Sequence, residues 1–224
     1  MTDNKEWFSE WFDSKYYHIL YKHRDFSEAE KFIRNLIEFI SPAADARFLD
    51  LACGKGRRAI FLNSMGFDVM GVDLSPASIN HANQFAKEDL RFEVHDMREP
   101  FHSKFDVVLN LFTSFGYFDS EAQNQQVINS MDSNLNKDGI LVIDYLNAQK
   151  VVSNLVPEEK QIIDGIEFNI TREIQGRNVV KQISFDAEGK SFHFTERVEL
   201  VQLHEFESYL NATSLQIFHT FGNY

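Results

Sequence analysis

The chain has 224 residues, 43% of them apolar and 22 of them phenylalanine, which allows one sizeable hydrophobic core and excludes a disordered protein. Its formal net charge of −12 and the lack of a basic patch in the sequence argue against a nucleic-acid partner. Cys53 is the single cysteine, and the sequence shows neither a secretion signal nor an apolar run of membrane-spanning length. We therefore expect a soluble, cytoplasmic protein without a membrane partner.

Residues 1–45 are predicted to be a helical N-terminal segment. Aromatic side chains crowd residues 7–21, and apolar residues then recur at helical spacing from residue 32 to residue 40. Pro42 ends that helix.

Residues 46–155 alternate between buried strands and helices. Strands are predicted over residues 47–52, 67–73, 90–95, 105–111 and 140–145. Ser75 followed by Pro76 marks the start of one intervening helix, and Asp119 is the expected cap of another. This alternation predicts an α/β fold, a doubly wound, Rossmann-like and mostly parallel sheet with helices on both faces.

The pattern changes near residue 156. Three extended segments without helices predict a small antiparallel β insertion over residues 156–202, with strands at residues 161–172, 178–186 and 191–201. Residues 203–224 are then expected to return to the core as a helix over Leu203–Leu210 and a sixth strand over Leu215–Thr220.

A glycine-containing loop follows the first predicted strand of the core. Gly54 and Gly56 allow the backbone to turn sharply and to approach a ligand closely, and the helix that follows offers free N–H groups. A glycine pair alone is weak evidence, because a simple tight turn between strand and helix has the same pattern.

Two carboxylates follow the next two predicted strands. Asp73 ends the second strand, where it can accept hydrogen bonds from both hydroxyls of a ribose, and Ser75 already fills the role of helix cap. Asp96 follows the third strand, where an adenine amino group can donate to it. One loop and two acids on consecutive strand ends predict an adenosine site.

These motifs resemble those of class I S-adenosylmethionine (SAM)-dependent methyltransferases, especially bacterial small-molecule members. The resemblance rests on Leu49–Gly56, on Gly71–Ser75 and on the pair Asp96-Met97, and it covers most of the chain from about Trp7 onward. One departure is Ala52, where many members have a glycine.

The resemblance implies a cofactor site for SAM, which becomes S-adenosylhomocysteine in the reaction. It implies that the loop faces the methionine part of SAM, that Asp73 holds the ribose, and that Asp50 orients the amino group, through water. Asp96 and Met97 contact adenine in this assignment. The full expected set of cofactor-binding residues is Asp50, Ala52, Gly54, Gly56, Asp73, Leu74, Asp96, Met97, Asn110, Tyr17 and Tyr21.

A nicotinamide dinucleotide site is the competing interpretation of these strand ends. Such a site expects Gly-x-Gly-x-x-Gly, whereas Gly54-Lys-Gly56 is followed by Arg57, Arg58 and Ala59. The pattern therefore favours SAM. The eight histidines show no metal-ligand spacing, so we expect no metal.

The acceptor of a methyltransferase normally lies beyond the fourth strand, here residues 110–118. The aromatic residues of this stretch fit a pocket wall or ordinary core packing. Family members often use the N-terminal segment as a lid, and for Tyr17 and Tyr21 contact with SAM and simple packing remain alternatives. The candidates for a general base are Tyr145, Asp144 and His18, and none stands out.

The main hypothesis is an enzyme that transfers a methyl group from SAM to an oxygen or nitrogen atom of a small molecule. The alternative is a SAM-binding sensor or partner subunit without methyltransferase activity; methylation of protein or RNA would need a basic or extended groove. The family usually closes with a seventh strand, which we expect to be absent because the sequence stops at Tyr224. An open sheet edge, or the β insertion, would then favour a homodimer.

Overall fold

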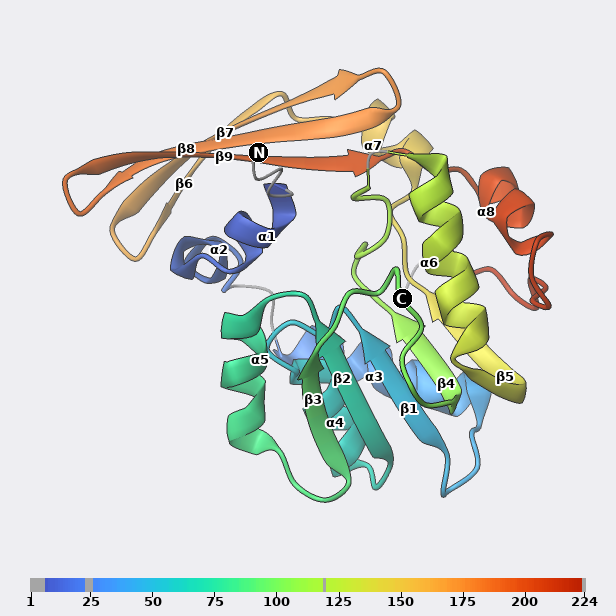
Figure 1. Cartoon of the computed structure of the whole chain (residues 1–224). Helices are drawn as coiled ribbons and strands as arrows, with labels where there is room; N and C mark the ends of the chain where they lie inside the picture. Colours follow the sequence, from blue (N-terminus) through green and yellow to red (C-terminus); the bar gives the residue numbers. More distant parts are fainter. Residues whose placement is uncertain (1–6, 23–25, 119, 223–224) are drawn as a thin grey trace, which may run out of the picture. The chain divides into compact units, whose positions relative to one another are not determined.

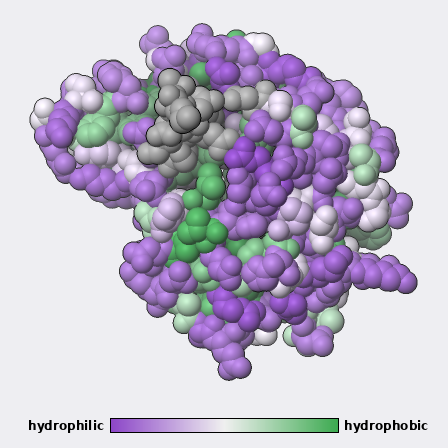
Figure 2. Space-filling view, viewed as in Figure 1, coloured by the Kyte–Doolittle hydropathy of each residue, from purple (hydrophilic) through white to green (hydrophobic). Residues whose placement is uncertain are grey.

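The computed structural model describes residues 7–22, 26–118 and 120–222, which form two compact units (Figure 1). The larger unit contains residues 25–114, 118–145 and 203–224, and the smaller contains residues 1–24, 115–117 and 146–202. The face seen in Figure 2 is mostly hydrophilic, as expected from a chain in which 25% of the residues are charged.

A five-stranded parallel sheet forms the centre of the larger unit. Its strand order is β3-β2-β1-β4-β5, so the order reverses between β1 and β4. Ligands of doubly wound sheets bind at such a reversal, beyond the carboxyl ends of the strands. The strands are β1 (Arg47–Leu51), β2 (Asp68–Asp73), β3 (Leu90–Val94), β4 (Phe105–Asn110) and β5 (Leu135–Ile143).

Helices of the larger unit bury apolar stripes against this sheet. Ile33 and Leu36 of α3 join Ala59 and Leu62 of α4 in one buried cluster that includes Phe48 of β1. This architecture confirms the predicted α/β, Rossmann-like fold. The helices are α3 (Phe26–Ile40), α4 (Arg57–Ser64), α5 (Pro76–Ala82), the 3₁₀ turn η1 (Asn83–Phe85), α6 (Glu121–Ser133) and α8 (Leu203–Leu210).

Of the two predicted helix caps, Ser75 is confirmed, whereas the N-cap of α6 is Ser120. Ser75 Oγ accepts a hydrogen bond from Ser78 N at 3.0 Å, and Pro76 occupies the first helical position of α5. Asp119 lies outside the described residues; Ser120 caps α6 by accepting a hydrogen bond from Gln123 N at 3.3 Å. Side-chain caps satisfy backbone donors that have no partner inside the helix.

The smaller unit is an antiparallel sheet, in the order β6-β7-β8-β9, with short helices on one face. Phe168 and Phe185 on that face are buried with Trp11, Tyr16 and Leu20. The elements are α1 (Trp7–Phe12), α2 (Lys15–Leu20), α7 (Ala148–Ser153), β6 (Glu158–Ile163), β7 (Ile166–Gln175), β8 (Asn178–Ala187) and β9 (Lys190–Glu199).

The predicted domain boundaries differ from these units. Residues 1–45 do not form one helical segment, because α1 and α2 pack on the antiparallel sheet whereas α3 packs in the parallel-sheet core. The smaller unit also takes in residues from 146 onward, ahead of the predicted start of the insertion at 156. Periodicity marks a buried face but does not say which sheet the face meets.

Two predicted strands were wrong in detail. The segment 161–172 is not one strand, because Asp164 and Gly165, with φ of 51° and 79°, turn the chain between β6 and β7. The segment Leu215–Thr220 forms no strand, since no neighbouring backbone pairs with it, and Phe218 is 90% exposed. Alternating apolar residues give strand propensity, but a strand also needs a hydrogen-bonded partner. No helix in the described ranges is long and apolar enough to cross a bilayer.

Candidate functional site

The loop after β1 is held in a left-handed conformation at three positions. Ala52, Gly54 and Gly56 have φ of 59°, 57° and 78°, and Gly56 precedes the first turn of α4. Cys53 N donates to Val72 O at 3.0 Å, which fastens the loop to β2. The loop therefore has a fixed path between the strand and the helix N-terminus.

The two glycines of this loop serve different purposes. A Cβ added at Gly56 would lie 2.6 Å from the Phe92 ring and 3.2 Å from Ala82 Cβ, so packing requires glycine there. A Cβ added at Gly54 would meet no atom within 4 Å. Gly54 thus faces open space, which is where a ligand can approach the backbone.

Asp73 joins the glycine loop to the end of β2. Its Oδ2 accepts a hydrogen bond from Gly54 N and its Oδ1 accepts one from Ser75 N, both at 2.8 Å. A carboxylate has about four acceptor sites, so one carboxylate can accept hydrogen bonds from backbone amides and from a ligand's hydroxyl groups. The structure therefore brings Asp73 and Gly54 together, as the adenosine site requires, and Leu74 follows, half-buried.

Asp50 is a buried acid without a hydrogen-bond partner among the described residues. Its side chain is 0% exposed at the end of β1, and neither carboxylate oxygen has a hydrogen-bond partner there. Burial raises the pKa of Asp50 to about 6; nearby Arg58 opposes this rise and Asp73 adds to it. An orphaned buried carboxylate of this kind is expected where a cationic or donor group of a ligand binds.

Asp96 is paired with an arginine that the sequence analysis did not identify. Arg98 Nε lies 3.0 Å from both Asp96 oxygens, and Arg98 N donates to Oδ1 at 2.9 Å. Burial works to raise the pKa of Asp96, but the hydrogen bonds from Arg98 outweigh it, and the pKa lies below its ordinary value. The Arg98 guanidinium also lies over the Phe118 ring, 4.7 Å from the centroid.

Asn110 brings the ends of three strands together. It is 0% exposed, and its Nδ2 donates to Leu51 O at 3.4 Å and to Met97 Sδ at 3.7 Å. Its Oδ1 is buried without a partner among the described residues. Asn110 and Met97, both predicted as cofactor residues, are thus in contact with each other.

The turn after β4 is strained and is held by Asp144. Phe112 and Thr113 have φ of 59° and 57°, which costs roughly 1–2 kcal/mol for each non-glycine residue. Asp144 Oδ2 accepts a hydrogen bond from Phe112 N at 2.8 Å, and Thr113 N donates to Asp144 O at 3.0 Å. This contact gives Asp144 a positioning role, whereas the neighbouring Tyr145 packs edge-on against Phe206 at 5.3 Å.

Tyr17, His18 and Tyr21 belong to the smaller unit. Tyr21 Oη donates to Glu196 at 2.7 Å, and Lys181 donates to the same hydroxyl oxygen. The Tyr17 ring packs against Tyr21, 4.9 Å between centroids, and His18 packs edge-on against Tyr17 at 5.3 Å. Lys181 and Glu196 could not be predicted from the sequence, because they belong to no motif.

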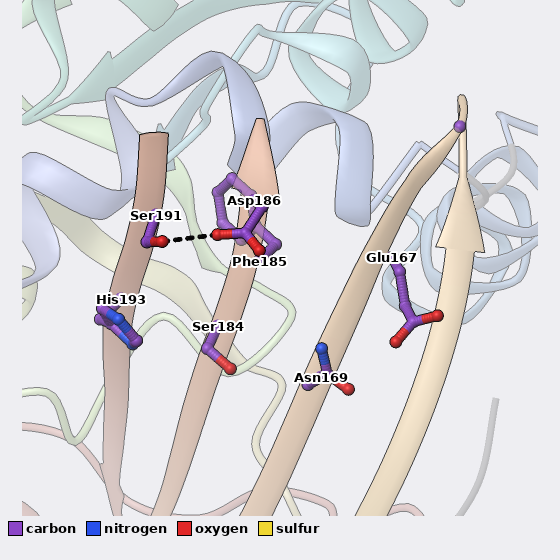
Figure 3. Close-up of a pocket in the computed structure, with 8 residues that line it drawn as sticks. Glu167, Asn169, Ser184, Phe185, Asp186, Ser191 and His193 are labelled. Atoms are coloured by element: carbon purple, nitrogen blue, oxygen red, sulfur yellow. Dashed lines mark hydrogen bonds between the residues drawn. The ribbon is translucent and has the colours of Figure 1, made fainter. Parts of the chain in front are cut away.

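A groove on the polar face of the antiparallel sheet was also not predicted (Figure 3). Its side chains come from β7, β8 and β9, and Ser191 Oγ donates to Asp186 Oδ1 at 2.6 Å. None of the predicted cofactor residues lines it. Its lining consists of Gly165, Glu167, Asn169, Ser184, Phe185, Asp186, Ser191 and His193. Within the described ranges, no group of three or more His, Cys, Asp or Glu side chains could hold a metal ion.

Comparison with known families identifies the family of this chain. A family described as a methyltransferase domain matches residues 42–195, which include the glycine loop, Asp73 and Asp96. The match covers more than half of the chain, so the chain belongs to this methyltransferase domain family. The sequence resemblance to SAM-dependent methyltransferases agrees with this family.

Individual relatives match over part of their length. A putative methyltransferase of Bacillus subtilis, YqeM, is 34% identical over 109 residues, 47% of this chain and 44% of that protein. The glycine/sarcosine N-methyltransferase of Parasynechococcus marenigrum is 30% identical over 132 residues, 56% of this chain and 45% of that protein. The chain thus spans about half the length of these curated relatives.

Solved structures share the fold over most of the chain. A SAM-dependent methyltransferase from Clostridium acetobutylicum has a TM-score of 0.76 at 22% identity, covering 91% of this chain and 86% of that one. The sugar N-methyltransferase KedS8 from Streptoalloteichus has a TM-score of 0.73 at 22% identity, covering 88% of this chain and 83% of that one. At these identities the likeness is one of fold.

Proposed function

We propose that this protein transfers a methyl group from SAM to a small-molecule acceptor, and that the acceptor atom is an amine nitrogen. The observation that carries the cofactor assignment is Asp50, a fully buried carboxylate without a hydrogen-bond partner among the described residues, at the end of β1. The names of related proteins support nitrogen, since they include a glycine/sarcosine N-methyltransferase and a sugar N-methyltransferase. The sequence left oxygen and nitrogen both open as the acceptor atom, so transfer to oxygen becomes an outcome of the test.

The residues at the strand ends fit the chemistry of the cofactor. Asp50 offers an anion for its ammonium group, Asp73 offers carboxylate oxygens for its ribose hydroxyls, and Gly54 leaves open space beside the loop. Asp96 and Met97 are assigned to adenine, and Asn110 offers an unsatisfied amide oxygen nearby. When bound, SAM supplies an electrophilic methyl group on a sulfonium.

The chain's own contribution is to hold the reacting groups in place and to exclude water. Asp73 fixes the loop through Gly54 N, and Asp144 fixes the turn after β4 through Phe112 N. Both contacts are made by carboxylates to backbone amides, which are strong hydrogen bonds that lock the backbone. We assign no general base, because none of the three candidates stands apart in geometry.

The first test is isothermal titration calorimetry with SAM and S-adenosylhomocysteine. We expect micromolar binding by the wild type and at least about ten-fold weaker binding by Asp73→Ala, which loses both the loop contact and the acceptor for ribose. Glu93→Ala is the matched control, because it removes an exposed carboxylate from the adjacent strand β3. Absence of binding by the wild type would refute the proposed function.

Methyl transfer separates an enzyme from a SAM-binding protein without activity. Formation of S-adenosylhomocysteine in the presence of small amines, such as glycine or an amino sugar, supports the proposal. Turnover with hydroxyl compounds only would replace nitrogen by oxygen as the acceptor atom. Tight SAM binding without turnover on either panel would favour the sensor or partner subunit.

A further inference from the structure

Two buried residues of opposite charge at the proposed cofactor site have polar atoms without a hydrogen-bond partner among the described residues. Asp50 is 0% exposed on β1, and Arg58 is 9% exposed in the first turn of α4. Neither oxygen of Asp50 has a hydrogen-bond partner among the described residues, and the same holds for Arg58 Nε. Because buried charged groups are normally paired and hydrogen-bonded, this arrangement fits a ligand that carries charge of both signs.

The two charges lie at the same end of the parallel sheet. Asp50 pairs with Leu109 of β4, and the Arg58 guanidinium lies over the ring of Phe112, just beyond β4, at 4.7 Å from the centroid. Each influences the other electrostatically, but the described contacts include no ion pair between them. Both are therefore at the point where the strand order reverses and where ligands of this fold bind.

We propose that Asp50 and Arg58 form a paired-charge site for the amino-acid end of the cofactor, in which Arg58 binds the carboxylate while Asp50 faces the ammonium. This inference rests on the proposed function. A guanidinium donates two parallel hydrogen bonds to a carboxylate, and stacking on Phe112 holds its plane in place. The N-terminus of α4 adds partial positive charge on the same side of the pair.

The wild-type protein can test this assignment with two ligands that differ by one group. Decarboxylated SAM keeps the sulfonium, the ammonium and the adenosine but lacks the carboxylate. Calorimetry at about pH 8, where Asp50 is ionised, should give at least about ten-fold tighter binding of SAM than of decarboxylated SAM. Equal affinity for the two ligands would overturn the inference while leaving the proposed function intact. If neither ligand binds, the proposed function fails as well.

Substitution of Arg58 then shows whether this residue is the source of the preference. In Arg58→Gln the ratio of the affinity for SAM to that for decarboxylated SAM should fall to about one, mainly through weaker SAM binding. Arg58→Lys should restore part of the preference for SAM. A residue that only neutralises Asp50 would weaken both ligands equally and keep the ratio. Arg58→Lys also keeps the test decisive if Arg58→Gln does not fold.

Arg57→Gln is the matched control, because it removes the same charge from the adjacent position of α4. We expect Arg57→Gln to keep the preference for SAM. Loss of the preference in Arg57→Gln with its retention in Arg58→Gln would overturn the assignment.

Discussion

Gly54 and Gly56 share a left-handed backbone but have different surroundings. For Gly56→Ala we expect a loss of about 1–3 kcal/mol of unfolding free energy, because the new Cβ would lie 2.6 Å from the Phe92 ring. Gly54→Ala meets no atom within 4 Å and should lose only about 1 kcal/mol from its positive φ. Its main effect should be weaker cofactor binding, since the methyl group enters the space assigned to the ligand.

Chemical denaturation and calorimetry with S-adenosylhomocysteine separate these two effects. The assignment of roles is wrong if Gly56→Ala is as stable as the wild type, or if Gly54→Ala binds the cofactor product normally. At this scale the sequence predicted that both positions need glycine. It did not predict why, because Phe92 lies on a different strand, β3, and approaches the loop only in the folded sheet.

At the scale of elements, one carboxylate attaches α1 and α2 to the antiparallel sheet. Glu196 of β9 accepts hydrogen bonds from Trp11 Nε1 at 2.6 Å and from Tyr21 Oη at 2.7 Å, and Lys181 lies 3.5 Å away. Glu196→Gln should cost about 2 kcal/mol and speed amide hydrogen exchange in residues 7–22, because the neutral amide weakens the charge-assisted bonds and removes the ion pair with Lys181. Exchange in α3 should not change, since α3 belongs to the other unit.

Glu188→Gln is the control for that experiment. Glu188 pairs with Lys15 of α2 at 2.5 Å, but the two side chains are 69% and 61% exposed, so the ion pair is screened by water. It should leave hydrogen exchange in residues 7–22 close to that of the wild type. Equal exchange in wild type and Glu196→Gln would mean that apolar packing alone holds these helices.

Local sequence signals located most helices and strands but failed where a strand depends on pairing with a neighbouring strand. Ser75 and Pro76 marked the start of α5, and apolar runs marked the five parallel strands. The Asp164-Gly165 turn was overlooked although this dipeptide favours tight hairpins, and the turn makes two strands out of one predicted segment. Residues 215–220 have strand-like alternation without a neighbour to pair with, which only the tertiary structure reveals.

At the scale of the whole molecule, chain order was enough to place the proposed cofactor residues on one sheet edge. Asp50, Gly54 and Asp73 could be predicted because strand ends of a parallel sheet gather at the same side. The partner residues Arg98 and Asp144 could not be predicted, since they act through contacts across a turn or between strands. The division of residues 1–45 between two units was likewise hidden, because α1 and α3 both have apolar faces.

The cost of the cofactor site to global stability follows from the pKa of Asp50. Its pKa is 3.8 in an exposed reference state and about 6 in the folded protein, so the unfolded chain releases this proton first as pH rises. Folding stability should therefore decrease between about pH 4 and pH 6, and the loss at pH 7 is on the order of 3 kcal/mol for a difference of about two pKa units. Asp50→Asn removes this dependence, so it should be more stable than the wild type at pH 7 but not at pH 4. Urea denaturation of both proteins across this range measures the difference directly.

A difference that is the same at every pH would show that Asp50 is not a buried titrating acid. Weaker SAM binding by the stabilised Asp50→Asn variant would show that the stability cost of the buried Asp50 charge is one that the ligand relieves.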